Sequence, residues 1–169
     1  MNKELSWDEL FMNMAYLVSM KSRDPNTHLG AVLVGPDKEV RGVGYNGFPR
    51  GVDYSYKERL NRPEKYYWFE HAERNSIYNA SLVGIPLKGC TMYTMGTPCC
   101  DCARACIQAG LSEVVVDKSW DDANIERWAD EAKRSQRMFL EAGVKLRQIT
   151  IDPVQIERYR RGKNIDSNR

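Results

Sequence analysis

The chain has 169 residues, and its 25 Lys and Arg against 23 Asp and Glu give a formal net charge of +2. Its 42% hydrophobic and 28% charged residues are typical of a folded globular protein and exclude a disordered chain. The small net charge speaks against a nucleic-acid partner, and the longest apolar run, residues 14–18, is too short to span a membrane. We expect a single domain over residues 1–169, with its core at about residues 5–151 and a charged tail at 152–169.

Five cysteines are present, and four of them lie within residues 99–106. Cysteines this close together cannot link distant segments. An odd number without a secretory signal indicates reduced thiols, and therefore a cytoplasmic protein whose clustered cysteines bind metal or do chemistry.

The N-terminal half is predicted to contain one helix and two strands. Ser6 and Glu9 have the spacing of a capping box and begin a helix that runs to about residue 21. A polar loop at residues 22–27 follows, and strands at 29–34 and 40–45 form a hairpin. Three glycines then fall within residues 44–51, and a polar and aromatic stretch extends to residue 68. A loop of this length is usually functional or disordered.

The C-terminal half alternates between helix and strand. Thr97 is the expected N-cap of one of these helices, with Pro98 at its first position. The alternation predicts an α/β fold of three layers, α/β/α, with a central mixed sheet of about five strands whose later strands are parallel. After Pro153 the charged tail could form a short helix. The predicted elements are residues 69–83, 90–95, 99–109, 114–116, a helix from 121, and 144–151.

Four side chains near two helix starts have the composition of a catalytic zinc site. His71 lies at one helix start, and Cys99 and Cys102 lie in the first turn of the next, on one helix face. One imidazole and two thiolates are sufficient to hold zinc while leaving a position for water, and a helix N-terminus lowers thiol pKa values. Glu73 supplies the carboxylate that could move protons for such a water.

The remaining histidine and cysteines are weaker candidates. A structural zinc would take four protein ligands, and His28, the other histidine, follows a loop of uncertain position. Cys100 points about 100° around the helix from its neighbour. Cys90 and Cys106 are expected to pack in the core, as free cysteines commonly do.

The site motifs resemble those of the zinc-dependent cytidine deaminase superfamily. His-Ala-Glu at residues 71–73 and Pro-Cys-Cys-Asp-Cys at 98–102 are similar to its H-x-E and P-C-x-x-C signature. From about residue 7 to 151 the chain resembles deoxycytidylate deaminases in particular. This second resemblance is carried by residues 22–27, 30–34, 44–51 and 71–77.

The resemblance implies a cytidine-deaminase-like fold and the hydrolytic conversion of dCMP to dUMP with release of ammonia, supplying dUMP for thymidylate synthesis. It implies that His71, Cys99 and Cys102 hold one Zn²⁺ per chain. In that mechanism zinc-bound hydroxide attacks C4 of the cytosine while Glu73 shuttles protons. It also implies a homo-oligomer, with a hexamer as the family's common form.

Substrate and regulatory positions follow from the same resemblance and from the chemistry of the residue types. Asn46 is expected at the sugar hydroxyl, the Ala72 N–H at the base carbonyl, and Trp120 over the base. Ser22 and Arg23 are the candidates for the 5′-phosphate. The family's regulatory site takes dCTP as activator and dTTP as inhibitor, with Mg²⁺ as an optional companion of the triphosphate. Its expected residues are Gly44, Tyr45, Gly47 and Arg50.

Two other functions stay open at this stage. One is deamination of a base within RNA or single-stranded DNA, which would need a basic groove or a stacking surface around the pocket. The other is a non-catalytic, zinc-stabilised interaction module. The chain also departs from the usual family pattern at Arg74 and Ser76, where apolar or small residues are more frequent.

Overall fold

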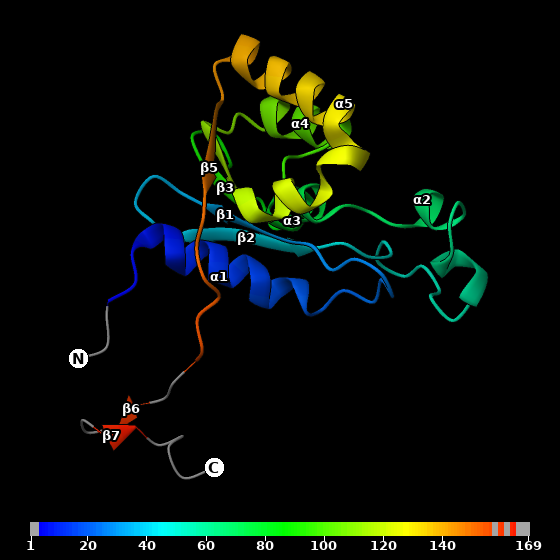
Figure 1. Ribbon diagram of the computed structural model, residues 1–169, viewed down its shortest axis with the longest axis horizontal. Coiled ribbons are helices and arrows are strands. Elements are labelled where there is room, and N and C mark those ends of the chain that lie inside the picture. Colours follow the sequence, from blue (N-terminus) through cyan, green and yellow to red (C-terminus); the bar gives the residue numbers. More distant parts are fainter. Residues whose placement is uncertain (1–3, 157–158, 161–162, 165–169) are drawn as a thin grey trace.

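The computed structural model describes residues 4–156, 159–160 and 163–164, and Figure 1 shows their arrangement. Helices and strands alternate after an initial helix and hairpin, as the sequence predicts. The elements are α1 (Trp7–Ser19), β1 (Gly30–Val34), β2 (Val40–Tyr45), the 3-10 helix η1 (Lys57–Leu60), α2 (Lys65–Trp68), α3 (Ala72–Leu82), β3 (Thr91–Thr94), α4 (Cys100–Gln108), β4 (Glu113–Asp117), α5 (Lys118–Ala142), β5 (Lys145–Ile149), β6 (Tyr159–Arg160) and β7 (Lys163–Asn164).

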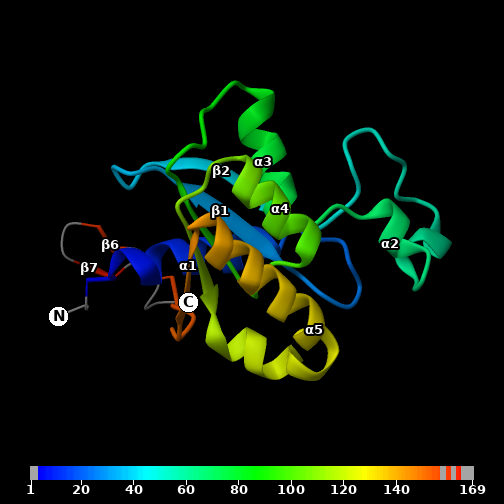
Figure 2. The ribbon, with the colours of Figure 1, turned by 90° about the horizontal axis from the view of Figure 1, so that it is seen from above.

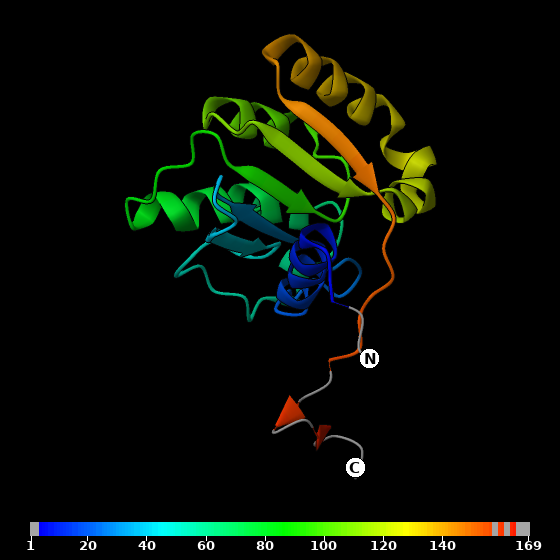
Figure 3. The ribbon, with the colours of Figure 1, turned by 90° about the vertical axis from the view of Figure 1, so that its left-hand side faces the viewer.

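A five-stranded mixed sheet in the order β2-β1-β3-β4-β5 forms the centre of the molecule. β1 runs antiparallel to both β2 and β3, and the pairs β3–β4 and β4–β5 are parallel. α1 lies on one face of the sheet, and α3, α4 and α5 cover the other, as Figure 3 shows. The predicted three-layer α/β fold is therefore confirmed.

Each face of the sheet packs its own hydrophobic cluster. Phe11, Met12 and Ala15 of α1 pack with inward residues such as Val32 and Val115. On the other face, side chains of α3, α4 and α5 pack with alternate residues of the same strands. β1 and the centre of β4 are buried throughout because both faces are covered, which explains their unbroken apolar sequence.

The first helix begins as predicted. Ser6 caps α1: its Oγ accepts a hydrogen bond from the Glu9 N–H at 3.2 Å, and its own N–H donates to Glu9 Oε2 at 2.7 Å. Both halves of the capping box are therefore present and satisfy two N–H groups at the helix start.

Three later helices begin at residues other than those predicted. α3 starts at Ala72, since Glu70 pairs as an isolated β-bridge with Gly47 and keeps the preceding backbone extended. α5 starts at Lys118, directly after β4, since the Asp117 carboxylate caps it by accepting from the Ser119 N–H at 2.9 Å.

The prediction that Thr97 caps α4 is wrong, because α4 starts at Cys100 and its N-cap is Cys99. The Thr97 hydroxyl donates to Asp121 Oδ2 and its N–H to Asp121 Oδ1, both at 2.7 Å. Thr97 is therefore committed to α5 and cannot cap α4. The shift places Cys99 at the cap and Cys102 in the first turn of the helix.

Two segments extend beyond the three layers. The long connection between β2 and α3 contains η1 and α2 and projects to one side of the sheet (Figures 1 and 2). In the tail, the described residues form the short antiparallel pair β6–β7 in place of the optional helix. Along the described part of the chain, no helix has both the length and the apolar character needed to cross a membrane.

Candidate active site

His71, Cys99 and Cys102 converge where α3 and α4 begin. His71 Nδ1 lies 3.5 Å from Cys99 Sγ and 3.5 Å from Cys102 Sγ. All three ligand atoms lie within 4.8 Å of one another, and these three residues make up the metal-ligand group found among the described residues. A tetrahedral zinc with typical ligand distances separates its ligands by about 3.5 Å. The donor set and its spacing therefore fit zinc.

Local structure brings the three donors together. His71 is the N-cap of α3 and Cys99 the N-cap of α4, so both side chains stand at helix N-termini. The loop before Cys99 is held by the two hydrogen bonds from Thr97 to Asp121, which also accepts from Gln148 Nε2 at 3.1 Å. α5 and β5 thus fix the loop that carries one sulfur.

The three donors change one another's protonation. The neighbouring Cys102 thiol and the His71 imidazole lower the pKa of the Cys99 thiol to about 4. The contact of its ring with Cys99 raises the pKa of His71 to about 9. The neighbouring Cys99, together with burial, raises the pKa of the Cys102 thiol. The lowered pKa of Cys99 favours the thiolate, which is the form that ligates zinc.

Glu73 lies in the first turn of α3 and is only 5% exposed. Burial is the main cause that raises the pKa of its carboxyl. Its Oε2 is the buried side-chain oxygen that has no hydrogen-bond partner among the described residues. An unsatisfied buried carboxyl oxygen is costly unless a ligand or water completes it, so this atom points to a role in binding or proton transfer.

A cavity of about 270 Å³ opens beside these residues and is lined by His71, Glu73 and Cys99. Its other walls come from the loop after α1, the segment around α2, and the start of α5. Further lining residues include Asp24, Thr27, Leu29, Asn46, Arg62, Lys65, Tyr66, Phe69, Gly96, Thr97, Pro98, Trp120, Asp121 and Asp122. The volume is suited to a small molecule.

Asn46 lies in this cavity wall and is 6% exposed. Its Oδ1 accepts from the Leu29 N–H, and its Nδ2 donates to the Thr27 carbonyl, both at 2.8 Å. Nδ2 also donates to Asp24 Oδ2 at 3.5 Å, so Oδ1 is the end of the amide that retains a further hydrogen-bonding position. Asn46 is thus fixed in orientation in the cavity wall, and its contact with a sugar hydroxyl stays a prediction.

Ser22 and Arg23 do not line the cavity. The buried Ser22 hydroxyl donates to the Asn46 carbonyl at 2.9 Å and accepts from the Asp24 N–H at 3.2 Å. Arg23 is exposed, and its guanidinium lies 3.7 Å from the centre of the Tyr54 ring. Both residues support the loop, and their predicted phosphate contacts stay a prediction.

Ala72 and Trp120 flank the reactive side chains. Ala72 is fully buried in the core and is the first residue of α3, between His71 and Glu73. Trp120 lines the cavity and packs against Gly96 so closely that a Cβ there would lie 2.6 Å from Trp120 Cδ1. The indole therefore forms part of the cavity wall, and its position over the base stays a prediction.

The predicted regulatory residues are divided between packing and exposure. A Cβ on Gly44 would lie 2.3 Å from Ser76 N, so Gly44 lets α3 pack closely on β2. Gly47 exchanges backbone hydrogen bonds with Glu70. Tyr45 and Arg50 are exposed, and the Arg50 guanidinium donates to Asn79 Oδ1.

The two departures from the usual family pattern are accommodated next to the site. Arg74 forms ion pairs with Glu70 and with Asp101, the latter at 3.3 Å, and so links α3 to α4. The Ser76 hydroxyl is buried and donates to the Glu73 carbonyl at 2.7 Å. Both polar side chains therefore have partners.

The other cysteines lie outside the metal-ligand group. Cys90 and Cys106 are buried in the core, as predicted. Cys100 faces α5, with its Sγ 3.7 Å from the Glu131 carbonyl oxygen.

Asp24, Lys65 and Asp121 are among the polar residues of the cavity wall that the sequence did not identify. Asp24 belongs to the polar loop that the sequence did single out, and Lys65 belongs to the long segment that was expected to be functional. Nothing local marks Asp121, because its contact with Thr97 joins residues 24 apart in the sequence.

Comparison with known proteins supports the chemistry that this site indicates. Residues 5–118 match the family model described as the cytidine and deoxycytidylate deaminase zinc-binding region. The deoxycytidylate deaminase of Homo sapiens is 37% identical over 151 residues, which cover 85% of this chain and 80% of the human protein. An uncharacterized deaminase of Aliivibrio fischeri is 37% identical over 146 residues, covering 86% of this chain and 95% of that protein.

Solved structures share the fold. The dCMP deaminase of cyanophage S-TIM5, crystallised with dCMP and dUMP, superposes with a TM-score of 0.66 at 20% identity. The match covers 88% of this chain and all of the phage chain. Fold, site and family model together define a zinc-dependent deaminase. More particularly, the chain belongs to the cytidine and deoxycytidylate deaminase family.

Proposed function

We propose that this enzyme converts dCMP to dUMP with release of ammonia. The observation that carries the proposal is the unpartnered Glu73 Oε2, buried in a cavity wall beside the His71, Cys99 and Cys102 group. The relatives named deoxycytidylate deaminase support dCMP as the substrate. The cavity volume is compatible with one nucleotide.

In this mechanism His71, Cys99 and Cys102 would hold zinc. Zinc bound there supplies Lewis-acid chemistry that lowers the pKa of water to near neutrality. Glu73 moves the protons: its Oε2 accepts a proton from the attacking water and delivers it to N3 of the cytosine. The same carboxyl then carries a second proton to the departing ammonia, so a carboxyl with a raised pKa suits both steps.

Other side chains orient the substrate. The Asn46 Oδ1 has one further lone pair for a sugar hydroxyl, since it accepts from the Leu29 N–H while Nδ2 donates to the Thr27 carbonyl and to Asp24 Oδ2. The Ala72 N–H is proposed to bind the base carbonyl, and Trp120 to stack on the base and exclude water.

The test is ammonia release by the purified protein with dCMP, CMP and deoxycytidine supplied separately. Glu73→Gln is expected to lose activity on dCMP by roughly 10²- to 10⁴-fold while keeping its zinc, since the amide cannot shuttle protons. Glu58→Gln, in the exposed 3-10 helix, is the matched control and should retain activity.

The two rival functions predict different results. A deaminase acting on RNA or single-stranded DNA would release ammonia from an oligonucleotide and leave dCMP unchanged. A zinc-stabilised interaction module would show no ammonia release in the wild type, and Glu73→Gln would change nothing.

The proposal extends to regulation and assembly through the family resemblance. We propose activation by dCTP and inhibition by dTTP, with Mg²⁺ accompanying the triphosphate, in a cytoplasmic homo-oligomer that is a hexamer. The exposed side chains of Tyr45 and Arg50 are the groups of the glycine-rich segment that a triphosphate could reach. Rates measured with each triphosphate, and the mass of the particle in solution, test these points.

A further inference from the structure

We infer that Asp121, in the first turn of α5, is a positioning residue of the zinc site. It holds Thr97, and through Thr97 it keeps the sulfur of Cys99 at the spacing that fits zinc. The inference concerns the metal site and does not depend on which substrate the enzyme deaminates. Asp121 lies outside the two motifs that carry the zinc ligands, residues 71–73 and 98–102.

The Asp121 carboxylate binds the loop that precedes Cys99 with both of its oxygens. Oδ1 accepts from the Thr97 N–H and Oδ2 from the Thr97 hydroxyl, both at 2.7 Å. Oδ2 also accepts from Gln148 Nε2 of β5 at 3.1 Å. Hydrogen bonds to an ionised carboxylate are stronger than those between neutral groups. Because Thr97 stands two residues before Cys99, little of the chain can move between this contact and the sulfur.

Packing holds the same loop against α5. Gly96 lies so close to Trp120 that a Cβ on it would be 2.6 Å from the Cδ1 atom of the indole and 3.4 Å from Asp121 Oδ1. The Pro98 side chain is fully buried, and its ring restricts the backbone. The loop is therefore held by packing at Gly96 and Pro98, and by hydrogen bonds at Thr97.

The first turn of α5 is itself anchored, so Asp121 acts from a fixed position. Asp117, the N-cap of α5, is 3% exposed and accepts from the Ser119 N–H at 2.9 Å. The Tyr16 hydroxyl of α1 donates to the same carboxylate. Contacts from α1 and, through Gln148, from β5 thus fix the helix start that carries Asp121. A metal ligand whose loop is fixed in advance loses little conformational freedom on binding.

The three ligands differ in how much they depend on such support. Cys102 lies within the first turn of α4, where the helical backbone fixes it, whereas Cys99 is the N-cap and stands at the end of the loop. The His71 N–H donates to Glu70 Oε1 at 2.9 Å, a contact that Asp121 does not touch. Loss of Asp121 is therefore expected to affect Cys99 before the other two ligands.

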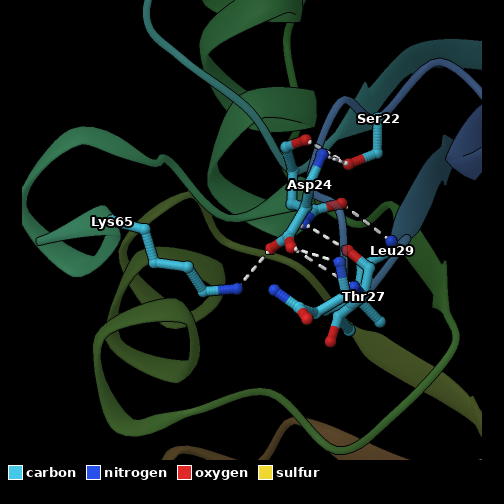
Figure 4. Close-up of polar contacts among 7 residues, drawn as sticks. Ser22, Asp24, Thr27, Leu29 and Lys65 are labelled. Atoms are coloured by element: carbon cyan, nitrogen blue, oxygen red, sulfur yellow. Dashed lines mark hydrogen bonds and ion pairs between the residues drawn. The ribbon is translucent and has the colours of Figure 1, made fainter. Parts of the chain in front are cut away.

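A second carboxylate of the cavity wall, Asp24, offers an internal comparison. It is 3% exposed, and its Oδ1 accepts from the N–H groups of Asn26 at 2.9 Å and Thr27 at 3.3 Å. Lys65 Nζ donates to its Oδ2 at 2.6 Å, as Figure 4 shows. Asp24 thus fixes a loop of the same cavity, but this loop carries none of the three metal ligands. Asp24→Asn should therefore change the cavity without changing the metal site.

The test measures the metal site of the full-length protein in the absence of substrate. Asp121→Ala is expected to bind zinc roughly tenfold to a hundredfold more weakly than wild type, the usual effect of removing a group that supports a metal ligand. Competition with a chelator measures this affinity. Asp121→Asn should restore most of it, because the amide can accept from the Thr97 N–H and donate to the Thr97 hydroxyl.

Cobalt provides a second measurement that a general loss of stability would not change. Co²⁺ binds to the same types of ligand as zinc, and its thiolate absorption band depends on the geometry at the sulfur atoms. The band should shift in Asp121→Ala and stay at the wild-type position in Asp24→Asn. Asp122→Ala, in the exposed neighbour that pairs with Lys118, is the matched control and should equal wild type in both measurements.

Two outcomes would overturn the inference. One is a zinc affinity and a cobalt band in Asp121→Ala that equal those of wild type. The other is an equal change in Asp121→Ala and Asp122→Ala, which would indicate an effect on α5 as a whole. If Asp121→Ala fails to fold, Thr97→Val tests the same contact, because it removes the hydroxyl and keeps the N–H. It is expected to weaken zinc binding less but in the same direction, and an unchanged affinity would count against the inference.

Discussion

Cys99 and Cys100 are neighbours in the chain, but their side chains meet different partners. Cys99 lies 3.5 Å from His71 Nδ1, whereas Cys100 faces the Glu131 carbonyl of α5. Because α4 begins at Cys100, Cys99 at the N-cap and Cys102 in the first turn lie on the same side of the helix. At the scale of single residues, the helix start therefore decides which thiols can bind metal.

Serine substitutions test this division. Cys99→Ser and Cys102→Ser are expected to lose most of the bound zinc and the deaminase activity, because a hydroxyl is a poor zinc ligand at neutral pH. Cys100→Ser should keep both, and it is the matched control in the same cluster. Metal analysis of the purified variants gives the result, and zinc loss in Cys100→Ser with retention in Cys99→Ser would contradict the proposed ligand set.

At the scale of elements, the packing of α3 on β2 sets the position of Glu73. Glycine allows the contact, since a Cβ on Gly44 would meet the backbone of α3 at 2.3 Å from Ser76 N and 2.4 Å from Ala72 O. α3 cannot move away without carrying Glu73 with it. Gly44 therefore has a packing role, which the sequence alone did not distinguish from phosphate binding.

Gly44→Ala is expected to lower the free energy of unfolding by about 1–3 kcal/mol, the usual cost of overpacking. Gly47→Ala is the control, because a Cβ there would only touch the Tyr45 ring at 3.5 Å, an ordinary contact distance. Urea denaturation monitored by tryptophan fluorescence compares the two. Equal stability of the two variants would show that α3 adjusts without cost.

At the scale of the whole molecule, ion pairs connect the first helix to the last strand of the sheet. Arg147 of β5 pairs with Asp8 of α1 and, at 3.0 Å, with Glu113 of β4. The Tyr93 hydroxyl also donates to Asp8 at 2.8 Å. The Arg147 guanidinium in particular lowers the pKa of Asp8 below its ordinary value of 3.8.

A lowered carboxyl pKa predicts stability that is present at neutral pH and lost in acid. Asp8→Asn should therefore destabilise the protein by about 1 kcal/mol above roughly pH 5, a small value because the pair is partly exposed. The difference from wild type should shrink as the pH falls through the folded pKa of Asp8. Urea denaturation across this range measures it, with Asp130→Asn on the exposed side of α5 as control. A difference that persists in strong acid would contradict the ion-pair explanation.

The alternation of helices and strands, the capping box of α1 and the spacing of His71, Glu73, Cys99 and Cys102 could all be interpreted from the sequence. They depend on periodicity and short-range spacing, which the chain carries locally. The predicted starts of the helices were less accurate. Thr97 was expected to cap α4, but its partner Asp121 comes from α5, and a cap shared across the fold leaves no local pattern.

By itself, the sequence determined the α/β class through periodicity, and it determined the four side chains of the site and the family resemblance through short motifs such as residues 71–73 and 98–102. Only the tertiary structure decided which residues form the cavity wall. The pair Asp24 and Lys65 joins residues 41 apart, and Ser22 and Arg23 turn out to lie beside the cavity wall and not in it. Contacts between distant segments depend on how the elements pack in three dimensions, and hydrophobic periodicity does not encode those pairings.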